Sequence, residues 1–324
     1  MASVSEQPAG FGGILQIVEI LKSQGYIAGR ELATSVHLSI VLNKPLLIEG
    51  EAGVGKTEVA KVMARALDTD LIRLQCYEGL DVHTALYEWN YQRQMLRIKL
   101  EEVSDRPIEE KEHVIFSEPF LLKRPLLQAI TADRAPVLLI DEVDRADEEF
   151  EAFLLEVLSD FQVSIPEIGT IRARHVPYVV LTSNRTRELS DALRRRCLYL
   201  WIDYPSFEKE LTIVHTKVPQ INERLAEQIC AFMQMIRAVP LSKVPGVAET
   251  LDWSGALFAL HRDHLDAQAI EETLGCLCKD QEDLVRMRTQ YMGPILDTVN
   301  GMGASDAWTS ERIASLAAQL PKGR

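Results

Sequence analysis

The sequence is poor in several features that would place it in a special class of protein. It has five cysteines among 324 residues, an odd number spread along the chain, which predicts reduced thiols rather than a disulfide framework. Lysine and arginine number 35 against 48 aspartate and glutamate, for a net charge of −13. Because DNA-coating surfaces are basic, this balance argues against a general DNA-coating role, while nucleic acid in a small local channel stays an alternative. No apolar run reaches the length of a membrane span, and the first residues lack the pattern of a secretory signal. We therefore expect a cytoplasmic protein.

The rest of the composition is that of an ordinary globular chain, with 47% apolar and 26% charged residues. Short apolar runs typical of buried strands occur at residues 45–49, 71–75, 137–141, 178–182 and 198–202. Stretches with helical periodicity separate these runs, which predicts an α/β parallel sheet with helices on both faces. After residue 205 the strand-like runs disappear and helical spacing dominates. We therefore expect an α/β nucleotide-binding domain over residues 1–205 and a smaller all-helical domain over residues 206–324.

Residues 50–57 read Gly-Glu-Ala-Gly-Val-Gly-Lys-Thr, a complete phosphate-loop pattern. Its glycines let backbone N–H groups turn inward around a polyphosphate. Lys56 places a positive charge on the β- and γ-phosphates, and the Thr57 hydroxyl is a ligand for Mg²⁺. An apolar run precedes the loop and an amphipathic helix follows it, as the motif requires; a chance glycine-rich turn is the alternative. The residues predicted to contact the nucleotide are Gly50, Glu51, Ala52, Gly53, Val54, Gly55, Lys56, Thr57 and Glu58.

Two acids follow one another where the apolar run 137–141 ends, namely Asp141 and Glu142. Open α/β sheets bind ligands at the carboxyl ends of their central strands. Asp141 is therefore predicted to hold Mg²⁺, directly or through water, and Glu142 to orient and polarise the attacking water. The alternative is that these acids cap the helix that begins near Asp147.

Polar and basic residues also stand at the ends of the later strand-like runs. Asn184 follows the run 178–182, and its neutral amide can position a water beside the γ-phosphate; a simple turn residue is the alternative. Arg194, Arg195 and Arg196 precede the run 198–202. A guanidinium stabilises the charge that develops in phosphoryl transfer and often comes from a neighbouring molecule, whereas an exposed basic turn is the alternative. Spacing alone does not choose among the three arginines.

Taken in order, these motifs resemble those of AAA+ ATPases and, within that group, the MoxR family. The matching segments are GEAGVGKT, LLIDEVDRADEEFEAFLLEVL, LTSN and DALRRRCLYLWIDYP. They correspond to Walker A, Walker B, sensor 1 and the arginine-finger segment, and the resemblance extends over about residues 35–205. The nearest likeness is to the CoxD type, ATPases that mature the metal centre of carbon monoxide dehydrogenase and related molybdenum enzymes.

The resemblance implies an AAA+ core, a P-loop NTPase sheet that carries a helical lid, with ATP and Mg²⁺ as ligands. Glu142 would be the catalytic acid and Asn184 the sensor 1 residue. Arg196 aligns with the arginine finger of the family. Its Arg-Arg-Cys context departs from the usual Asp-Arg-Phe, so Arg195 remains a competitor. The family forms homo-oligomeric rings, typically hexamers, in which each finger completes the site of the next subunit.

The predicted function is ATP-driven remodelling of a client protein by a MoxR-type chaperone. The resemblance implies a metalloenzyme client, such as a molybdenum hydroxylase or carbon monoxide dehydrogenase, and a von Willebrand A-type adaptor. One alternative is a DNA-directed AAA+ motor, which the acidic balance disfavours. A nucleotide-gated scaffold is the other, and the pair of Asp141 and Glu142 argues against it.

Aromatic residues cluster in the segment that follows the second strand-like run. Tyr77 lies where AAA+ rings place a pore loop, and for this residue substrate contact and core packing are both open. For Tyr87, Trp89 and Tyr91 we expect packing onto the core, because Leu86, Met95 and Leu96 add apolar surface.

Two later segments extend the resemblance. Residues 160–176 alternate around a Pro-Glu-Ile-Gly turn, which predicts a β-hairpin of the kind that family members use for substrate contact. In the helical domain, Gly255 stands where the family carries its sensor 2 arginine. Lys243 is a candidate replacement, and weak coupling of the lid to the nucleotide is the alternative.

Overall fold

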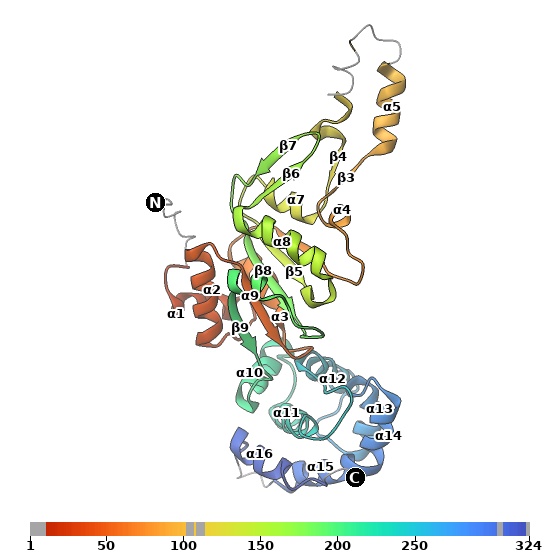
Figure 1. Cartoon of the computed structure of the whole chain (residues 1–324). Helices are drawn as coiled ribbons and strands as arrows, with labels where there is room; N and C mark the ends of the chain where they lie inside the picture. The colour runs from red at the N-terminus through yellow and green to blue at the C-terminus, as the bar shows by residue number, and fades with distance from the viewer. Residues whose placement is uncertain (1–10, 102–106, 108–113, 303–306, 322–324) are drawn as a thin grey trace. The chain divides into compact units, whose positions relative to one another are not determined.

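The computed structural model describes residues 11–101, 107, 114–302 and 307–321. The chain forms two compact units (Figure 1). The first contains Met1–Gln24, Ala28–Gly50 and Lys56–Trp201, and the second contains Gly25–Ile27, Glu51–Gly55 and Ile202–Arg324. The phosphate loop therefore begins and ends in the first unit, while its middle residues belong to the second.

A five-stranded sheet forms the centre of the first unit. The strands β1 (Leu46–Gly50), β2 (Leu71–Gln75), β5 (Val137–Asp141), β8 (Tyr178–Ser183) and β9 (Leu198–Ile202) lie in the order β2-β5-β8-β1-β9. Neighbouring strands from β2 to β1 pair in parallel, with Leu139 opposite both Arg73 and Val180. Each of these strands coincides within a residue or two with a predicted apolar run, and the predicted parallel sheet is confirmed.

Helices cover both faces of the sheet. In β5, Leu138 and Ile140 join a buried cluster with α7 (Pro125–Ile130) and α8 (Glu148–Asp160). Since successive strand residues point to opposite faces, the buried Leu139 faces the other side, where α3 (Lys56–Ala66) packs. The first unit also contains α1 (Ile14–Ser23), α2 (Arg30–Leu42), the short α4 (Val82–Ala85) and α9 (Asp191–Arg196), and 3₁₀ turns at Glu118–Phe120 and Val143–Arg145.

Two small antiparallel pairs extend from this core (Figure 1). The strands β6 (Gln162–Ile165) and β7 (Gly169–Arg172) form the predicted hairpin, which is confirmed. The other pair, β3 (Tyr87–Trp89) with β4 (Leu121–Lys123), was not expected from the sequence. Its partners are separated by more than thirty residues, so no turn signal marks the pairing.

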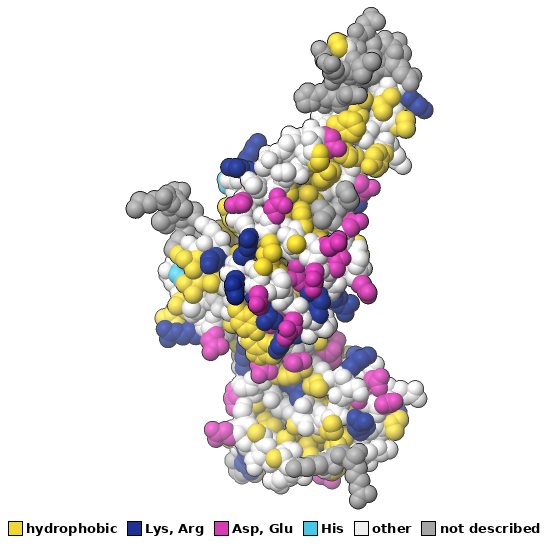
Figure 2. All heavy atoms as spheres, in the orientation of Figure 1, with side chains coloured by type: hydrophobic (Ala, Val, Ile, Leu, Met, Phe, Trp, Pro, Cys, Tyr) yellow, Lys and Arg dark blue, Asp and Glu magenta, His cyan; other side chains and the backbone are white. Residues whose placement is uncertain are grey.

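The expected packing of the aromatic segment is partly wrong. Trp89 is buried and meets Phe116 edge to face. Tyr91, Met95 and Leu96 instead lie exposed on α5 (Tyr91–Glu101), with 68%, 57% and 60% of their surface accessible. The helix packs by the face that carries Gln94, whose amide donates to the carbonyl of Ile115 at 3.0 Å, and Figure 2 shows the hydrophobic side chains along its outer side.

The second unit is built from helices after Ile202. These are α10 (Phe207–Lys217), α11 (Glu223–Ile236), α12 (Val247–Ala259), α13 (Ala267–Leu277), α14 (Gln281–Arg286), the π-helical turn Met287–Tyr291, α15 (Met292–Gly301) and α16 (Ser310–Ala317). The apolar side chains of α11 form the centre, and Phe232 packs on the fully buried Trp253 with ring centroids 5.2 Å apart. Glu210 and Arg237 form a buried ion pair at 2.6 Å, so neither charge is left without a partner.

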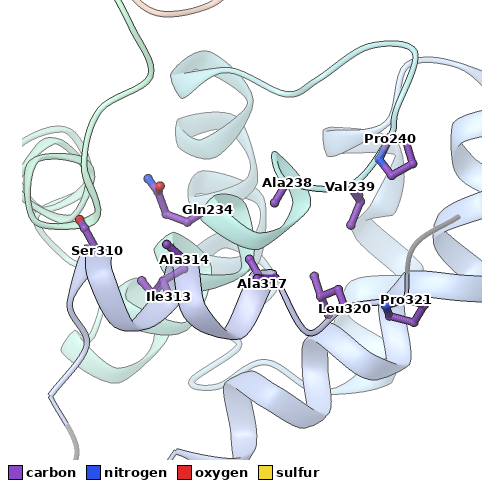
Figure 3. Close-up of a pocket in the computed structure, with 11 residues that line it drawn as sticks. Gln234, Ala238, Val239, Pro240, Ser310, Ile313, Ala314, Ala317, Leu320 and Pro321 are labelled. Carbon is purple, nitrogen blue, oxygen red and sulfur yellow. The ribbon is translucent and has the colours of Figure 1, made fainter.

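A pocket of about 600 Å³ lies between the C-terminal end of α11 and α16 (Figure 3). Its lining includes Gln234, Val239, Ile313 and Leu320, and no acidic or basic side chain among the residues that the structure describes. Such a lining offers no group for acid–base chemistry. No helix in the described ranges has the length and apolarity required to cross a membrane.

Candidate functional site

The phosphate loop joins the end of β1 to the first turn of α3. Gly53 and Gly55 adopt φ of 74° and 93°, a left-handed backbone that side chains other than glycine rarely adopt. The Lys56 side chain is buried, and its Nζ donates to the carbonyl of Gly50 at 2.7 Å. The charge is therefore folded back over the loop. Glu58 lies in the first turn of α3, where it pairs with Arg65 at 3.0 Å.

The middle of the loop is held by the start of α12, within the second unit. The backbone N–H groups of Val247 and Ala248 donate to the carbonyl of Gly53 at 3.0 and 3.2 Å. Gly246 makes this approach possible, because a Cβ at its position would lie 2.7 Å from the carbonyl oxygen of Ala52. This contact was not predicted from the sequence, where only the Pro-Gly pair before a helical pattern marks it. Gly255, which stands in place of the family's sensor 2 arginine, lies within α12, and the backbone N–H of Lys243, the candidate replacement, donates to Asp283 at 3.0 Å.

The carboxylate of Asp141 links the end of β5 to the phosphate loop by hydrogen bonds. It is 2% exposed, and its Oδ1 accepts from the hydroxyls of Thr57 at 2.9 Å and Thr182 at 2.6 Å. Its Oδ2 accepts from Arg73, from Nε at 3.1 Å and from Nη2 at 2.5 Å. Thr57 and Asp141 are 84 positions apart in the sequence, and both are predicted Mg²⁺ residues. Thr182 and Arg73 were not predicted.

The donor set at this point fits Mg²⁺. A hydroxyl and a carboxylate are hard oxygen donors, and Mg²⁺ is commonly bound by one or two such side chains with phosphates and waters filling the other positions. The described part of the chain contains no group of three or more His, Cys, Asp or Glu side chains that could hold a metal ion. Thr57 and Asp141 are the residues that would hold the ion.

Glu142 directly follows Asp141 in the chain and shares one of its hydrogen-bond partners. Its backbone has φ of 54°, the left-handed region that costs a residue with a side chain free energy and is often found at functional sites. Its N–H donates to the Thr182 hydroxyl at 2.9 Å, and its Oε2 pairs with Nε of Arg145 at 2.9 Å. The Thr182 hydroxyl thus accepts from Glu142 and donates to Asp141, so one side chain aligns both acids.

The position of Asn184 is set by an acid that was not predicted from the sequence. Asp144 is 2% exposed, and its carboxylate accepts from the N–H of Asn184 at 3.2 Å. It also accepts from Thr186, at 2.8 Å from the N–H and 2.7 Å from the hydroxyl. The 3₁₀ turn after β5 therefore holds the turn after β8. The available signal was a further acid in the Walker B segment, shortly after Asp141 and Glu142.

The three arginines have three different environments. Arg194 is paired with Glu49, a buried acid at the end of β1, at 3.6 Å. Arg196 donates from Nη1 to the carbonyl of Leu155 at 2.6 Å. Arg195 is exposed and makes no hydrogen bond or ion pair with the residues that the structure describes. Arg194 and Arg196 thus have partners within their own unit, whereas Arg195 has none among the described residues.

Cys76 lies directly after β2, and the pKa of its thiol reflects the negative charge at this edge of the sheet. Burial, followed by the charges of Asp141, Asp144 and Glu142, raises the pKa of its thiol from 9.0 to about 12. Both causes act in the same direction, because burial and neighbouring carboxylates each oppose formation of a thiolate.

This environment predicts unreactive thiols. At pH 8 we expect iodoacetamide to alkylate Cys76 at least about a thousandfold more slowly than an ordinary thiol, because only the thiolate reacts. Burial also raises the pKa of Cys197, Cys230 and Cys278, so the half-buried Cys276 should react first. Mass spectrometry of timed samples measures the order, and urea-unfolded protein is the control in which all five should react alike. Rapid labelling of Cys76 in the native protein would contradict this account of the site.

Residues 45–197 match the family model described as AAA domain (dynein-related subfamily). The match covers a little less than half of the chain, from β1 to the end of α9, and includes every site residue of the first unit discussed above. Together with the parallel sheet, it defines the fold class as an AAA+ P-loop NTPase domain followed by a helical region. This family match does not distinguish MoxR or CoxD-type proteins from other AAA+ proteins.

Relatives and solved structures give no more specific function. An uncharacterized protein of Staphylococcus aureus (strain bovine RF122 / ET3-1) is 24% identical over 206 residues, which cover 61% of this chain and 70% of the relative. The RuvB Holliday junction branch migration motor of Thermotoga maritima is 17% identical, with 88% of this chain and 82% of that chain covered and a TM-score of 0.45. A putative ATPase from Cytophaga hutchinsonii is 16% identical, with coverage of 89% and 93% and a TM-score of 0.45.

Proposed function

We propose that the chain is a Mg²⁺-dependent ATPase of the AAA+ type that remodels a client protein. The single observation that carries the ATPase proposal is the 2.9 Å contact between the hydroxyl of Thr57 and the carboxylate of Asp141. It joins the phosphate loop to the acid at the end of β5, which is the pairing needed to hold Mg²⁺ against a bound triphosphate.

Each site residue has a role in this reaction. Lys56 binds the β- and γ-phosphates, and Thr57 with Asp141 would hold Mg²⁺, which when bound draws charge from the phosphate oxygens. Glu142 is the group that orients and polarises the attacking water, and Asn184 positions that water without adding charge. Arg145 pairs with Oε2 of Glu142 at 2.9 Å, and the second oxygen of the carboxylate can take this role.

The biological role rests on the motif resemblance to MoxR-type chaperones. We propose a cytoplasmic homo-oligomeric ring, a hexamer by that resemblance, that acts on a metalloenzyme client with a von Willebrand A-type adaptor. The CoxD likeness favours a molybdenum hydroxylase or carbon monoxide dehydrogenase as the client. Tyr77, which is 46% exposed after β2, and the β6–β7 hairpin are the segments available for client contact.

Among the arginines, we assign the trans finger to Arg195 in preference to Arg196. Arg196 is bound to the carbonyl of Leu155 and Arg194 to Glu49, so each would have to break an intrachain contact to reach a neighbouring subunit. Arg195 has no such contact within the described residues and is exposed on α9.

The assignment predicts that Arg195→Ala lowers ATP turnover by about a thousandfold, the scale of an arginine finger, while ATP binding is retained. Arg196→Ala is the matched control and should lose about tenfold or less, since it removes a hydrogen bond that supports the segment. Phosphate release and binding of a fluorescent ATP analogue measure the two effects.

Mixing subunits tests whether the finger acts in trans. Arg195→Ala subunits carry an intact phosphate loop, and Lys56→Ala subunits carry an intact finger, so a mixture should recover part of the turnover that neither variant has alone. A larger loss for Arg196→Ala than for Arg195→Ala would reverse the assignment. Absence of recovery in a mixed ring would count against a shared site.

A further inference from the structure

The carboxylate of Asp141 is paired with the guanidinium of Arg73. Nε and Nη2 of Arg73 both donate to Oδ2, at 3.1 and 2.5 Å, while the two threonine hydroxyls occupy Oδ1. The side chain of Asp141 is 3% exposed and that of Arg73 is 49% exposed. The charge of a buried carboxylate is thus balanced by a guanidinium that reaches in from the surface.

The sheet explains how Arg73 reaches this carboxylate. β2 is an edge strand beside β5, with Arg73 opposite Leu139 and Gln75 opposite Asp141. The guanidinium extends along β2, and its Nη2 also donates to Oε1 of Gln75 at 2.5 Å. Because half of the side chain is in solvent, it can leave Asp141 without disturbing the buried strands.

We propose that Arg73 competes with Mg²⁺ for Asp141 and thereby sets the Mg²⁺ concentration at which the nucleotide complex forms. Both cations are attracted to the same buried carboxylate, and two positive charges a few ångströms apart repel one another. Entry of Mg²⁺ therefore requires the guanidinium to give up Oδ2. Arg73 acts through Asp141 and is a positioning residue.

The competition decides whether removal of Arg73 strengthens or weakens Mg²⁺ binding. Removing Arg73 takes away the guanidinium that balances the Asp141 charge, so Mg²⁺ should bind more readily. If Arg73 instead served only to hold the carboxylate in position for the ion, its removal would weaken Mg²⁺ binding. The inference rests on the proposed ATPase site, since it concerns the ion that Thr57 and Asp141 would hold.

The test is a Mg²⁺ titration of the full chain at a fixed concentration of a fluorescent ATP analogue. Wild type, Arg73→Gln and Arg73→Lys are compared, with Arg134→Gln as the matched control. Arg134 pairs with Asp70 at 3.4 Å in the same unit and is 58% exposed, so its removal takes away the same charge without touching Asp141. The Mg²⁺-dependent rise in melting temperature with ADP bound supplies a second readout that does not depend on turnover.

We expect Arg73→Gln to lower the Mg²⁺ midpoint by about five- to tenfold, the scale of one charge-assisted hydrogen-bond pair. Arg73→Lys keeps the positive charge but has one nitrogen in place of the two that donate to Asp141. Its Mg²⁺ midpoint should therefore lie between those of Arg73→Gln and wild type. Arg134→Gln should match wild type.

An unchanged or raised midpoint in Arg73→Gln, with Arg73→Lys equal to wild type, would overturn the inference and leave the ATPase proposal standing. Failure of folded wild type to bind the analogue at any Mg²⁺ concentration would overturn both. If Arg73→Gln does not fold, the comparison of Arg73→Lys with wild type decides the sign.

Discussion

Replacing Glu142 by glutamine is expected to lower ATP turnover by about a hundredfold or more, the contribution of a positioned general base, while ATP still binds. Glutamine keeps the size of the side chain but cannot accept a proton from the attacking water. Glu156→Gln is the control, because Glu156 is exposed on the neighbouring helix α8. Phosphate release gives turnover, and equilibrium binding of ATP gives affinity. Turnover equal to wild type would remove Glu142 from the mechanism and favour a nucleotide-gated scaffold.

The same variant also tests the remodelling role. A ring that holds ATP without hydrolysing it should retain its client, so a pull-down with Glu142→Gln should enrich a protein that wild type releases. The double variant Lys56→Ala, Glu142→Gln is the matched control, since it should hold neither nucleotide nor client. Equal recovery with both baits, or no enriched protein, would count against the chaperone proposal. Turnover that DNA stimulates would favour the DNA-directed alternative.

The second large effect is expected from Lys56→Ala, which should weaken ATP binding by about a hundredfold, the upper range for hydrogen bonds to a charged group. The Nζ of Lys56 is held at the carbonyl of Gly50, so the variant removes both the charge and an internal support of the loop. Lys61→Ala is the control, because Lys61 lies in the same helix and pairs at its surface with Glu58, at 3.5 Å. Isothermal titration calorimetry measures both variants.

Similar ATP affinity in Lys56→Ala and Lys61→Ala would show that the loop binds its ligand in some other way. Melting temperatures without nucleotide separate this case from misfolding. A folded Lys56→Ala protein with a normal melting temperature and no ATP binding is the outcome that supports the site.

The central sheet could be predicted because its strands are short apolar runs with helical patterns between them. Leu138 to Ile140 are buried on both faces, and such strands leave a continuous apolar signal. The β3–β4 pair leaves no such signal, because its strands are three residues long and far apart in the chain. The exposed face of α5 could not be predicted either, since periodicity shows that Tyr91 and Met95 share a face but not whether that face is covered.

The site residues also divide into those that leave a signal in the sequence and those that only the fold brings together. Motif spacing identified Thr57 and Asp141, which the fold brings together. The residues that hydrogen-bond to Asp141, Arg73 and Thr182, come from strands on either side of β5, and only the strand order makes them neighbours. The choice between Arg195 and Arg196 depends on which guanidinium already has an intrachain acceptor, and sequence spacing carries no information about that.

The amides at the start of α12 have a consequence for the thermodynamics of ligand binding. Glycines give the phosphate loop wide conformational freedom, and ordering such a backbone costs roughly 1–2 kcal/mol of entropy per residue. Because Val247 and Ala248 hold the carbonyl of Gly53, part of that ordering takes place when the chain folds rather than when the nucleotide binds. A preorganised loop retains more of its phosphate contacts as net affinity, and in this protein a peptide far along the chain supplies the preorganisation.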